Sequence, residues 1–303
     1  MGLWMDMYIS VFGSVLWCDW FLNISLAIFI QDSQLITILI YLGLTAVSLA
    51  YLALCKKNIP KTLRLHKMNI LTVFLVLVLS VVVRPLTGFF SLLGTMFFQD
   101  LVTSSITQEV SSGLMIVMIS TALLPGIVEE LIFRGIIYSG MRKANPIKGI
   151  LFCALFFGIA HMNFQQFCYA FVLGIILGIL LEATDSLFAP MLLHATFNGT
   201  SLLLTYLMTL IPSFSNAAET NSASDLTTLI AFFPYAAVSL ILTILLIAAI
   251  AHFSGRLGYM KTWFSSRIRR TWPKEKAASV SYFAAVGICA FFAVITELLA
   301  SIA

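Results

Sequence analysis

Three charged side chains, Glu129, Glu130 and Arg134, lie inside an otherwise apolar stretch of the chain, residues 114–138. A charged side chain at the centre of a bilayer costs about 2.5–3.5 kcal/mol, so charges in such a stretch need partners or a function. If the stretch is helical, Glu130 and Arg134 share a face as an i,i+4 pair, and Glu129 is turned about 140° away from Arg134. We therefore expect Arg134 to neutralise Glu130 and to leave the Glu129 carboxylate free for chemistry.

Two histidines also lie within or at the end of apolar stretches. His161 follows Phe157 at the end of one stretch, and His194 is followed by Asn198 four residues later, on the same helical face. Counted from the cytoplasmic end of each stretch at about 1.5 Å per residue, Glu129, His161, His194 and Asn198 lie roughly 12–22 Å deep. Polar groups from three helices thus fall near the middle of a core about 30 Å thick. A shared, hydrated cavity in the membrane interior is the expected arrangement.

These residue types fit the hydrolysis of a peptide bond. A desolvated carboxylate without its own counter-ion gains proton affinity and suits a general base, which is the role expected of Glu129. One histidine can orient the water and protonate the leaving amine, while the other histidine and Asn198 supply donors for the oxyanion. Glu129, His161 and His194 are also an acceptable zinc ligand set, with a zinc-bound water as nucleophile. The sequence leaves both mechanisms open.

The elements that position these residues are predicted to be membrane helices. Hydrophobic residues make up 60% of the 303-residue chain and charged residues only 10%, against about 25% charged in soluble domains. We therefore predict an all-α, polytopic integral membrane bundle of about eight or nine transmembrane helices, with no nucleic-acid partner. Residues 113–208 are expected to carry the catalytic helices between N-terminal (1–112) and C-terminal (209–303) helices of one membrane domain. The apolar stretches fall near residues 8–30, 35–54, 69–94, 113–140, 147–162, 165–182, 186–208, 226–251 and 279–302.

Lysine and arginine cluster in three loops, near residues 56–67, 142–148 and 256–276. The positive-inside rule predicts that all three face the cytoplasm. Two further features concern helix packing. Gly174 and Gly178 form a G-x-x-x-G pair that predicts a close helix contact, and Arg84-Pro85 predicts a kink with a snorkelling arginine.

The polar residues form three short motifs in a fixed order: Glu129-Glu130-x-x-x-Arg134, Phe157-x-x-x-His161 and His194-x-x-x-Asn198. These motifs resemble those of the CPBP family, which contains type II CAAX prenyl endopeptidases and bacteriocin-processing or immunity (Abi) proteins, all multi-spanning intramembrane endopeptidases. The resemblance covers roughly residues 113–200, under a third of the chain. It implies a catalytic group of Glu129, His161, His194 and Asn198 and a supporting group of Glu130 and Arg134.

The expected function is that of an intramembrane endopeptidase in which Glu129 and His161 activate water and His194 and Asn198 stabilise the oxyanion. The glutamate mechanism needs no cofactor, whereas the metallopeptidase alternative needs zinc. The expected partners are membrane lipids and a peptide or lipidated-protein substrate, prenylated or of the bacteriocin type. The expected location is a cell membrane, as a multi-pass protein of a prokaryote. Two alternatives stay open: a non-catalytic immunity or binding member of the family, and a proton-coupled transporter, because intramembrane Glu and His also mark proton relays.

Overall fold

The computed structural model describes residues 30, 32–54, 58–100, 109, 113–143, 145–210, 226–273 and 278–302. All regular structure in this part of the chain is helical, which confirms the all-α prediction. The elements are α2 (Ser33–Leu54), α3 (Ile59–Leu63), α4 (Ile70–Val82), α5 (Arg84–Thr95), α7 (Leu114–Val117), η1 (Met118–Leu123), α8 (Leu124–Glu130), η2 (Leu131–Ile137), α9 (Tyr138–Met141), α10 (Pro146–Ile159), α11 (Phe164–Thr184), α12 (Phe188–Thr209), α14 (Leu226–Phe253), α15 (Leu257–Thr262), α16 (Ser266–Arg269) and α17 (Val280–Ile302).

Six helical segments within these ranges are long and apolar enough to cross a membrane, as expected of a multi-pass membrane protein. The predicted span 8–30 lies outside the described residues, and α10 is a shorter apolar helix of 14 residues. α12 has 22 residues but is not among the six segments, and it carries His194 and Asn198. The predicted total of eight or nine spans stays a prediction. The six segments are Ser33–Leu54, Ile70–Thr95, Leu114–Met141, Phe164–Thr184, Leu226–Phe253 and Val280–Ile302.

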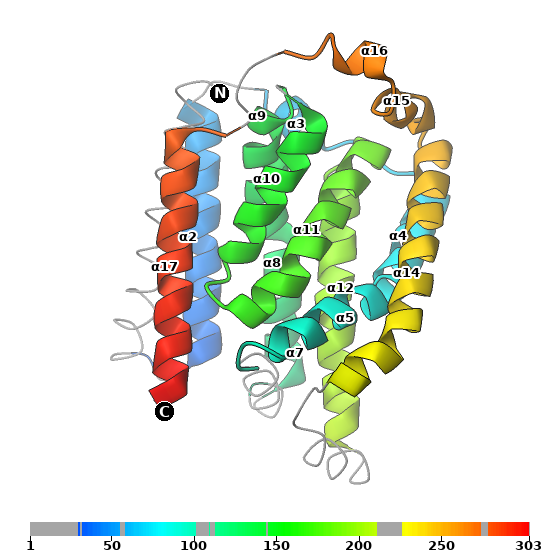
Figure 1. Ribbon diagram of the computed structural model, residues 1–303. Coiled ribbons are helices and arrows are strands. Elements are labelled where there is room, and N and C mark those ends of the chain that lie inside the picture. Colours follow the sequence, from blue (N-terminus) through cyan, green and yellow to red (C-terminus); the bar gives the residue numbers. More distant parts are fainter. Residues whose placement is uncertain are drawn as a thin grey trace.

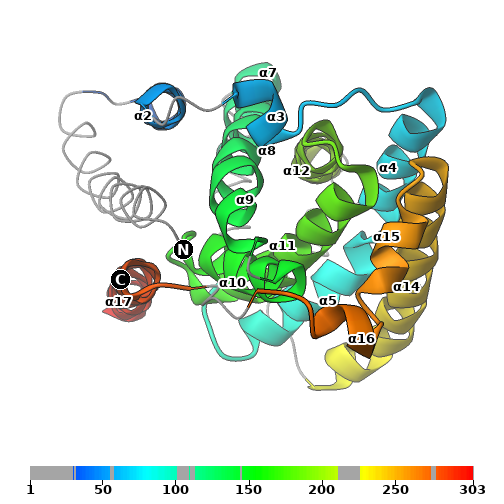
Figure 2. The same cartoon turned by 90° about the horizontal axis from the view of Figure 1, so that it is seen from above.

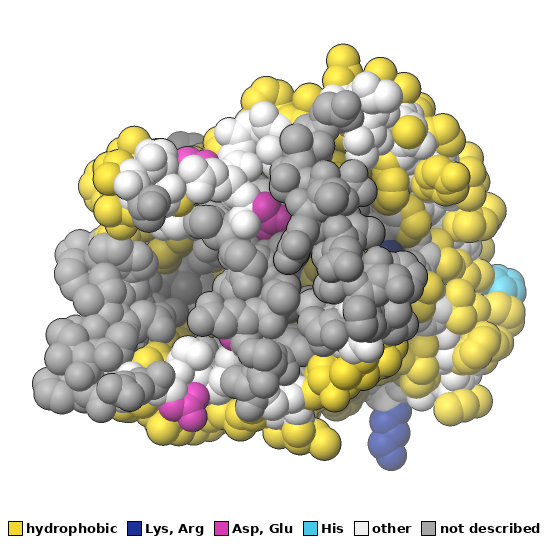
Figure 3. Space-filling view, turned by 90° about the horizontal axis from the view of Figure 1, so that it is seen from below, with side chains coloured by type: hydrophobic (Ala, Val, Ile, Leu, Met, Phe, Trp, Pro, Cys, Tyr) yellow, Lys and Arg dark blue, Asp and Glu magenta, His cyan; other side chains and the backbone are white. Residues whose placement is uncertain are grey.

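The outer surface of the bundle is strongly apolar. On α14, Ile241, Ile244 and Leu245 each expose more than half of their surface. Seen from the end where α12 finishes and α14 begins, hydrophobic side chains form much of the outline of the molecule (Figure 3). Apolar surface on this scale is unusual on a soluble monomer and fits contact with lipid.

Most of the long helices run side by side along one direction, and α5 crosses that direction (Figure 1). α2 and α17 flank one side of the molecule and α4 and α14 the other, with α8, α10, α11 and α12 between them (Figures 1 and 2). The closest central pairs are α10 with α11 and α8 with α12. A Cβ added to Gly174 would lie 3.1 Å from Ala154, and one added to Gly178 would lie 3.1 Å from Ile150. The predicted close contact at the glycine pair is therefore confirmed, between α11 and α10.

The helix is interrupted between α4 and α5, at Arg84-Pro85. Because Pro85 has no N–H, helical hydrogen bonding is interrupted here. The Ser239 hydroxyl of α14 bridges the interrupted turn, because it donates to the Val82 carbonyl (2.6 Å) and accepts from the Leu86 N–H (3.2 Å). The predicted kink is thus confirmed, but the expected snorkelling of Arg84 is wrong. Its guanidinium contacts α12, which offers hydroxyl and carbonyl acceptors inside the protein.

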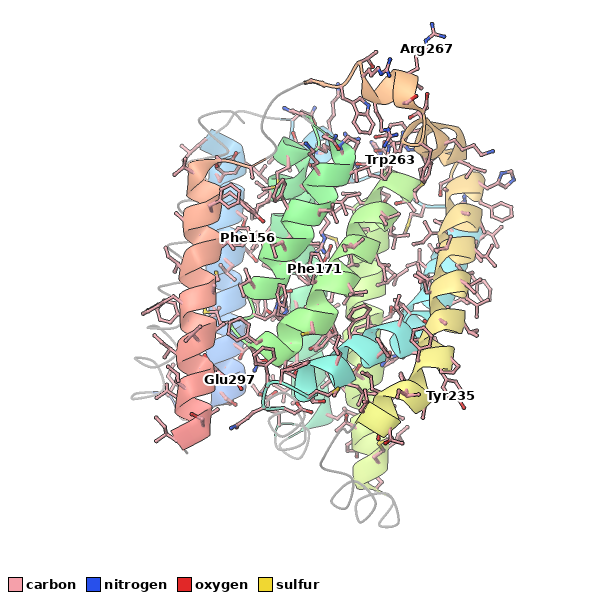
Figure 4. All side chains as sticks on the ribbon, in the orientation of Figure 1. Phe156, Phe171, Tyr235, Trp263, Arg267 and Glu297 are labelled. Carbon is pink, nitrogen blue, oxygen red and sulfur yellow. The ribbon has the colours of Figure 1, made fainter. Side chains whose placement is uncertain are left out.

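The basic loops gather at one end of the bundle, where α3, α9, α15 and α16 lie (Figure 1). Arg267 projects from this end, and Glu297 and Tyr235 lie toward the opposite end (Figure 4). The common placement agrees with the expectation that the three loops share one side of a membrane. Most of the loops expected on the other side, 95–112 and 209–225, lie outside the described residues.

A fully buried carboxylate, Glu182 near the end of α11, holds this basic end together. Arg64 and Arg142 form ion pairs with it at 2.9 and 2.8 Å, and Arg256 lies 3.8 Å away. The Tyr138 hydroxyl also donates to Glu182 (2.9 Å). Burial disfavours the Arg142 cation, but the Glu182 carboxylate outweighs this effect and raises the pKa of Arg142 above its ordinary value. One carboxylate therefore joins loops that lie far apart in the sequence.

Candidate active site

The helix that carries both candidate glutamates has irregular hydrogen bonding on either side. α8 lies between two π-helical segments, η1 and η2, and such wide turns often occur at functional sites. Pro125 at the start of α8 cannot donate to the carbonyl of Thr121, four residues earlier. Asn198 on α12 donates to that carbonyl instead, at 3.2 Å. This bond fixes the Asn198 side chain and leaves its second amide hydrogen available.

Gly126 allows α8 to approach α12 closely. A Cβ on Gly126 would lie 2.7 Å from the backbone nitrogen of Ala195, so no larger residue fits without a shift. Ala195 follows His194 directly, and Glu129 and Glu130 follow Gly126 by one turn of helix. The close approach therefore brings the glutamates and His194 within reach of each other.

Glu130 and Arg134 form the predicted i,i+4 ion pair. Arg134 Nη1 lies 2.8 Å from Glu130 Oε1, and both side chains are buried. Arg134 Nη2 donates to the Gly174 carbonyl of α11 (3.0 Å), and the guanidinium lies 4.3 Å from the centre of the Phe157 ring. The pair thus also links α8 and η2 to α10 and α11.

His194 lies between the two glutamates. Its Nδ1 is 2.9 Å from Glu130 Oε1, and its Nε2 is 4.0 Å from Glu129 Oε2. A carboxylate on one ring nitrogen orients the imidazole and directs the other nitrogen, as in many histidine sites. Glu130 therefore holds His194 so that Nε2 points toward Glu129, a contact that the sequence motifs did not predict.

Phe157 separates and orients the two histidines. Its ring packs edge-on against His161 and His194, with centroid distances of 5.1 and 5.7 Å. The carbonyl of Phe157 accepts a hydrogen bond from His161 Nδ1 (2.8 Å). Because a carbonyl oxygen can only accept, Nδ1 carries the proton, and Nε2 of the neutral ring is left as an acceptor. The Phe157-x-x-x-His161 spacing is therefore a direct structural requirement of this contact.

Glu129 has different surroundings from those of Glu130. Its Oε1 accepts a hydrogen bond from the Tyr41 hydroxyl of α2, at 2.6 Å. Its Oε2 is buried but has no hydrogen-bond partner among the residues that the structure describes. No arginine or lysine in those ranges forms an ion pair with this carboxylate, in contrast to Glu130. An ionisable partner of Glu129 Oε2 in the described part of the chain is His194 Nε2, at 4.0 Å. The expectation that Glu129 is left free for chemistry stays a prediction.

The four candidate catalytic residues line one cavity of about 560 Å³. Glu130 and Arg134 lie behind it and do not contribute to its wall. The cavity extends toward the end of the bundle opposite the basic loops. There it is lined by residues such as Thr37, near the start of α2, and Gln165, near the start of α11. Hydroxyl and amide groups lie among apolar side chains in its lining. Its volume leaves room for a water and for an extended piece of peptide.

The zinc alternative requires three ligands that converge on one point. Within the described ranges, no three His, Cys, Asp or Glu side chains are placed to hold a metal ion together. Glu129, His161 and His194 as placed therefore do not form a ligand set. The zinc alternative itself stays a prediction.

The polar residues of the cavity that the sequence reasoning missed include Tyr41 and Arg84. Tyr41 is one of two tyrosines in the apolar helix α2 and carries no local signal. Arg84 did stand out as a charge inside an apolar stretch, the same signal that identified Glu129.

The comparisons with known proteins concern the part of the chain that carries the motifs. Residues 111–200 match the family model described as Type II CAAX prenyl endopeptidase Rce1-like. No curated protein and no solved structure matches the chain. The matched range contains the three motifs, which agrees with the resemblance drawn from the residues. Residues 111–200, under a third of the chain, are therefore similar to the Rce1-like type II CAAX prenyl endopeptidase family.

Proposed function

We propose that this protein is an intramembrane endopeptidase in which the Glu129 carboxylate activates the attacking water. The observation that carries the proposal is the state of Glu129 Oε2, which is buried, lacks a hydrogen-bond partner in the described part of the chain and lies 4.0 Å from His194 Nε2. An unsatisfied buried carboxylate oxygen is costly. Glu130 Oε2 also lacks a partner among the described residues, but Glu130 pairs with Arg134 and does not line the cavity, whereas Glu129 does line it. The similarity of residues 111–200 to a protease family adds support.

The proposed reaction begins with a water between Glu129 and His161. Glu129 Oε2 accepts a proton as the water oxygen bonds to the substrate carbonyl carbon, and the carbonyl electrons move to its oxygen. His161 Nε2, which the Phe157 carbonyl leaves as an acceptor, orients the same water. The captured proton then moves to the peptide nitrogen as the C–N bond breaks, which releases an amine and a carboxylic acid.

The oxyanion formed in this step needs donors. Asn198 has one amide hydrogen not used by Thr121. His194 can donate from Nε2 when its ring is protonated, and the positive ring would then lie between the Glu129 and Glu130 carboxylates. In this proposal Glu130 and Arg134 act through His194 and do not contact the substrate.

The proposed substrate is a membrane protein or peptide, prenylated or of another lipid-associated class, and the apolar outer surface is proposed to contact lipid directly. The active site is proposed to lie in the membrane interior, because its residues lie on helices flanked by membrane-spanning segments. The location proposed from the sequence is the cell membrane of a prokaryote, in which the protein would be multi-pass.

The test is cleavage of a mixed membrane-peptide library, including farnesylated CAAX peptides, by the purified chain in detergent. Glu129→Gln removes the base without changing the shape of the side chain, and we expect a loss of about 10³- to 10⁴-fold in kcat/KM. Glu297→Gln is the matched control, because Glu297 lies on α17, outside the cavity lining, and accepts a hydrogen bond from the Gln99 backbone N–H.

Each arm is repeated with a strong chelator. Cleavage that survives chelation but not Glu129→Gln supports the glutamate mechanism, and loss in chelator supports a metallopeptidase. No cleavage by a folded native sample would contradict the proposal and favour a binding or transport role, which proton flux into liposomes would then test.

A further inference from the structure

Arg84 is a cation in the wall of the catalytic cavity that the proposed mechanism does not use. It is the first residue of α5, is half-buried, and lines the same cavity as Glu129 and His194. It lies outside residues 111–200, so the family match does not account for it.

The partners of Arg84 are all neutral. Its guanidinium donates to the Ser201 hydroxyl (3.0 Å), to the Phe197 carbonyl and to the Thr200 hydroxyl, all on α12. It also lies 4.9 Å from the centre of the Phe197 ring. Among the described residues, no Asp or Glu forms an ion pair with it within 4.0 Å, although Glu109 lines the same cavity. The positive charge is therefore held in place but not neutralised.

The other enclosed arginines of the bundle differ in this respect. Arg64, Arg142 and Arg256 pair with Glu182, and Arg134 pairs with Glu130. A cation inside a membrane protein normally has a partner of opposite charge or faces a functional cavity. Arg84 faces a cavity, and its three hydrogen bonds to α12 leave two of its five N–H donors for a ligand.

The contacts of Arg84 with α12 set its distance from the reacting groups, because His194 lies on the same helix. Ser201, which binds Arg84, follows His194 by seven residues, so the two lie on one face about 10.5 Å apart along the helix. An extended peptide spans about 3.3–3.6 Å per residue, so this distance corresponds to about three residues. A substrate group bound at Arg84 would thus lie about three residues from the bond beside Glu129.

We propose that Arg84 binds a carboxylate of the substrate, about three residues away from the bond that is cleaved. A carboxylate would accept a charge-assisted hydrogen bond from Nε or Nη1, the nitrogens that keep an open N–H, and would neutralise a charge that has no ion-pair partner in the described part of the chain. The carboxylate has two sources, the end of a peptide chain or an acidic side chain. The distance to the cleaved bond rests on the proposed function, whereas the binding itself does not.

The test measures binding without turnover, in the Glu129→Gln background and in detergent. The probes are three dye-labelled farnesylated CAAX peptides. Two share one sequence and end in a free acid or an amide, and the third is an amide with glutamate as the last residue. On the chain with Arg84, we expect the free acid to bind about 10- to 100-fold more tightly than the plain amide, because a charge-assisted hydrogen bond has this strength. Tight binding of the glutamate form would extend recognition to acidic side chains.

The variants separate recognition from structural support. Arg84→Gln should weaken the free acid about 10- to 100-fold and leave the amide unchanged. Arg267→Gln is the matched control, because Arg267 is exposed at the basic end (Figure 4) and should change neither affinity. Equal affinities of acid and amide for the unmutated site, including no binding of either, would overturn the proposal, and this arm needs no substitution at Arg84. An equal loss of both forms in Arg84→Gln would show that Arg84 only supports the fold.

Cleavage is measured separately on the chain with Glu129 restored. A difference between acid and amide binding together with no cleavage would contradict the peptidase proposal alone. Cleavage with no acid preference would contradict the role of Arg84 alone.

Discussion

Two carboxylates of this bundle, Glu182 and Glu129, are both enclosed by protein but have opposite surroundings. Glu182 is fully buried, lies within 4 Å of three arginines and accepts a tyrosine hydroxyl. Glu129 accepts one tyrosine hydroxyl, has an unsatisfied oxygen in the part of the chain that the structure describes, and faces a cavity. Both glutamates are expensive to bury. The difference is that Glu182 is compensated more than once, whereas Glu129 keeps a lone pair available.

This contrast separates a structural carboxylate from a candidate catalytic one. At the basic end, charge compensation joins loops from α3, α9 and α15 to the end of α11. At the cavity, Glu130 takes the compensating contacts, with Arg134 and His194, and adjacent Glu129 is left to face the substrate. Burial alone would rank Glu182 and Glu130 above Glu129, and Glu130 Oε2 also lacks a hydrogen-bond partner among the described residues. The better indicator of function is therefore that Glu129 lines the cavity and forms no ion pair with an arginine or lysine of the described ranges, whereas Glu130 pairs with Arg134.

The largest effect on stability is expected from Glu182→Gln. Three guanidiniums would lose their main counter-charge, although Asp185 stays within 4 Å of Arg64 and Arg256. Breaking a buried ion-pair cluster from one side costs about 3–5 kcal/mol. Thermal unfolding in detergent, followed with a thiol-reactive dye that reports exposure of the buried Cys153 and Cys289, measures this loss.

Glu129→Gln is the matched change at the cavity. It removes a charge of the same kind from a site with little compensation, so we expect unchanged or slightly higher stability. An equal loss of stability in the two variants would contradict the contrast between the sites.

A smaller effect is expected where α8 meets α12. Gly126→Ala places a methyl group 2.7 Å from the Ala195 backbone, and overpacking of this kind costs about 1–3 kcal/mol. Gly43→Ala on α2 is the control, because an added Cβ there meets nothing within 4 Å. The shift should also weaken the Glu130–His194 contact and lower kcat, which the peptidase assay measures. A drop in kcat for Gly43→Ala of the same size would mean that the loss is not specific to this contact.

The contacts within one helix could be predicted from the sequence, and those between helices mostly could not. The Glu130–Arg134 pair follows from i,i+4 geometry, and the close approach of α10 and α11 follows from Gly174 and Gly178. The contact of His194 with Glu130 depends on which helix faces α12, and sequence spacing alone does not determine this. The break at Pro85 was predictable, but the direction of Arg84 was not, because it depends on acceptors supplied by α12.

Glu182 is a different kind of omission, because a signal was present. It lies at the end of an apolar stretch, three residues before Asp185, and the positive-inside rule had already placed three basic loops on one side. A carboxylate at the end of a helix beside three arginine-containing loops predicts an ion-pair cluster. The motifs drew attention to the cavity because they repeat a known order of residues, whereas the Glu182 cluster has no local motif.

The smallest effect, and the most direct comparison of the two tyrosine–glutamate contacts, is expected from Tyr41→Phe. Tyr41 donates to Glu129 as Tyr138 donates to Glu182, at 2.6 and 2.9 Å. Loss of the phenol should reduce kcat/KM by about tenfold, because one charge-assisted hydrogen bond would no longer hold the base in position. Tyr138→Phe should leave kcat/KM unchanged and affect only stability, because three arginines stay with Glu182. A kcat/KM of Tyr41→Phe equal to that of the native chain would mean that Tyr41 only packs α2 against α8.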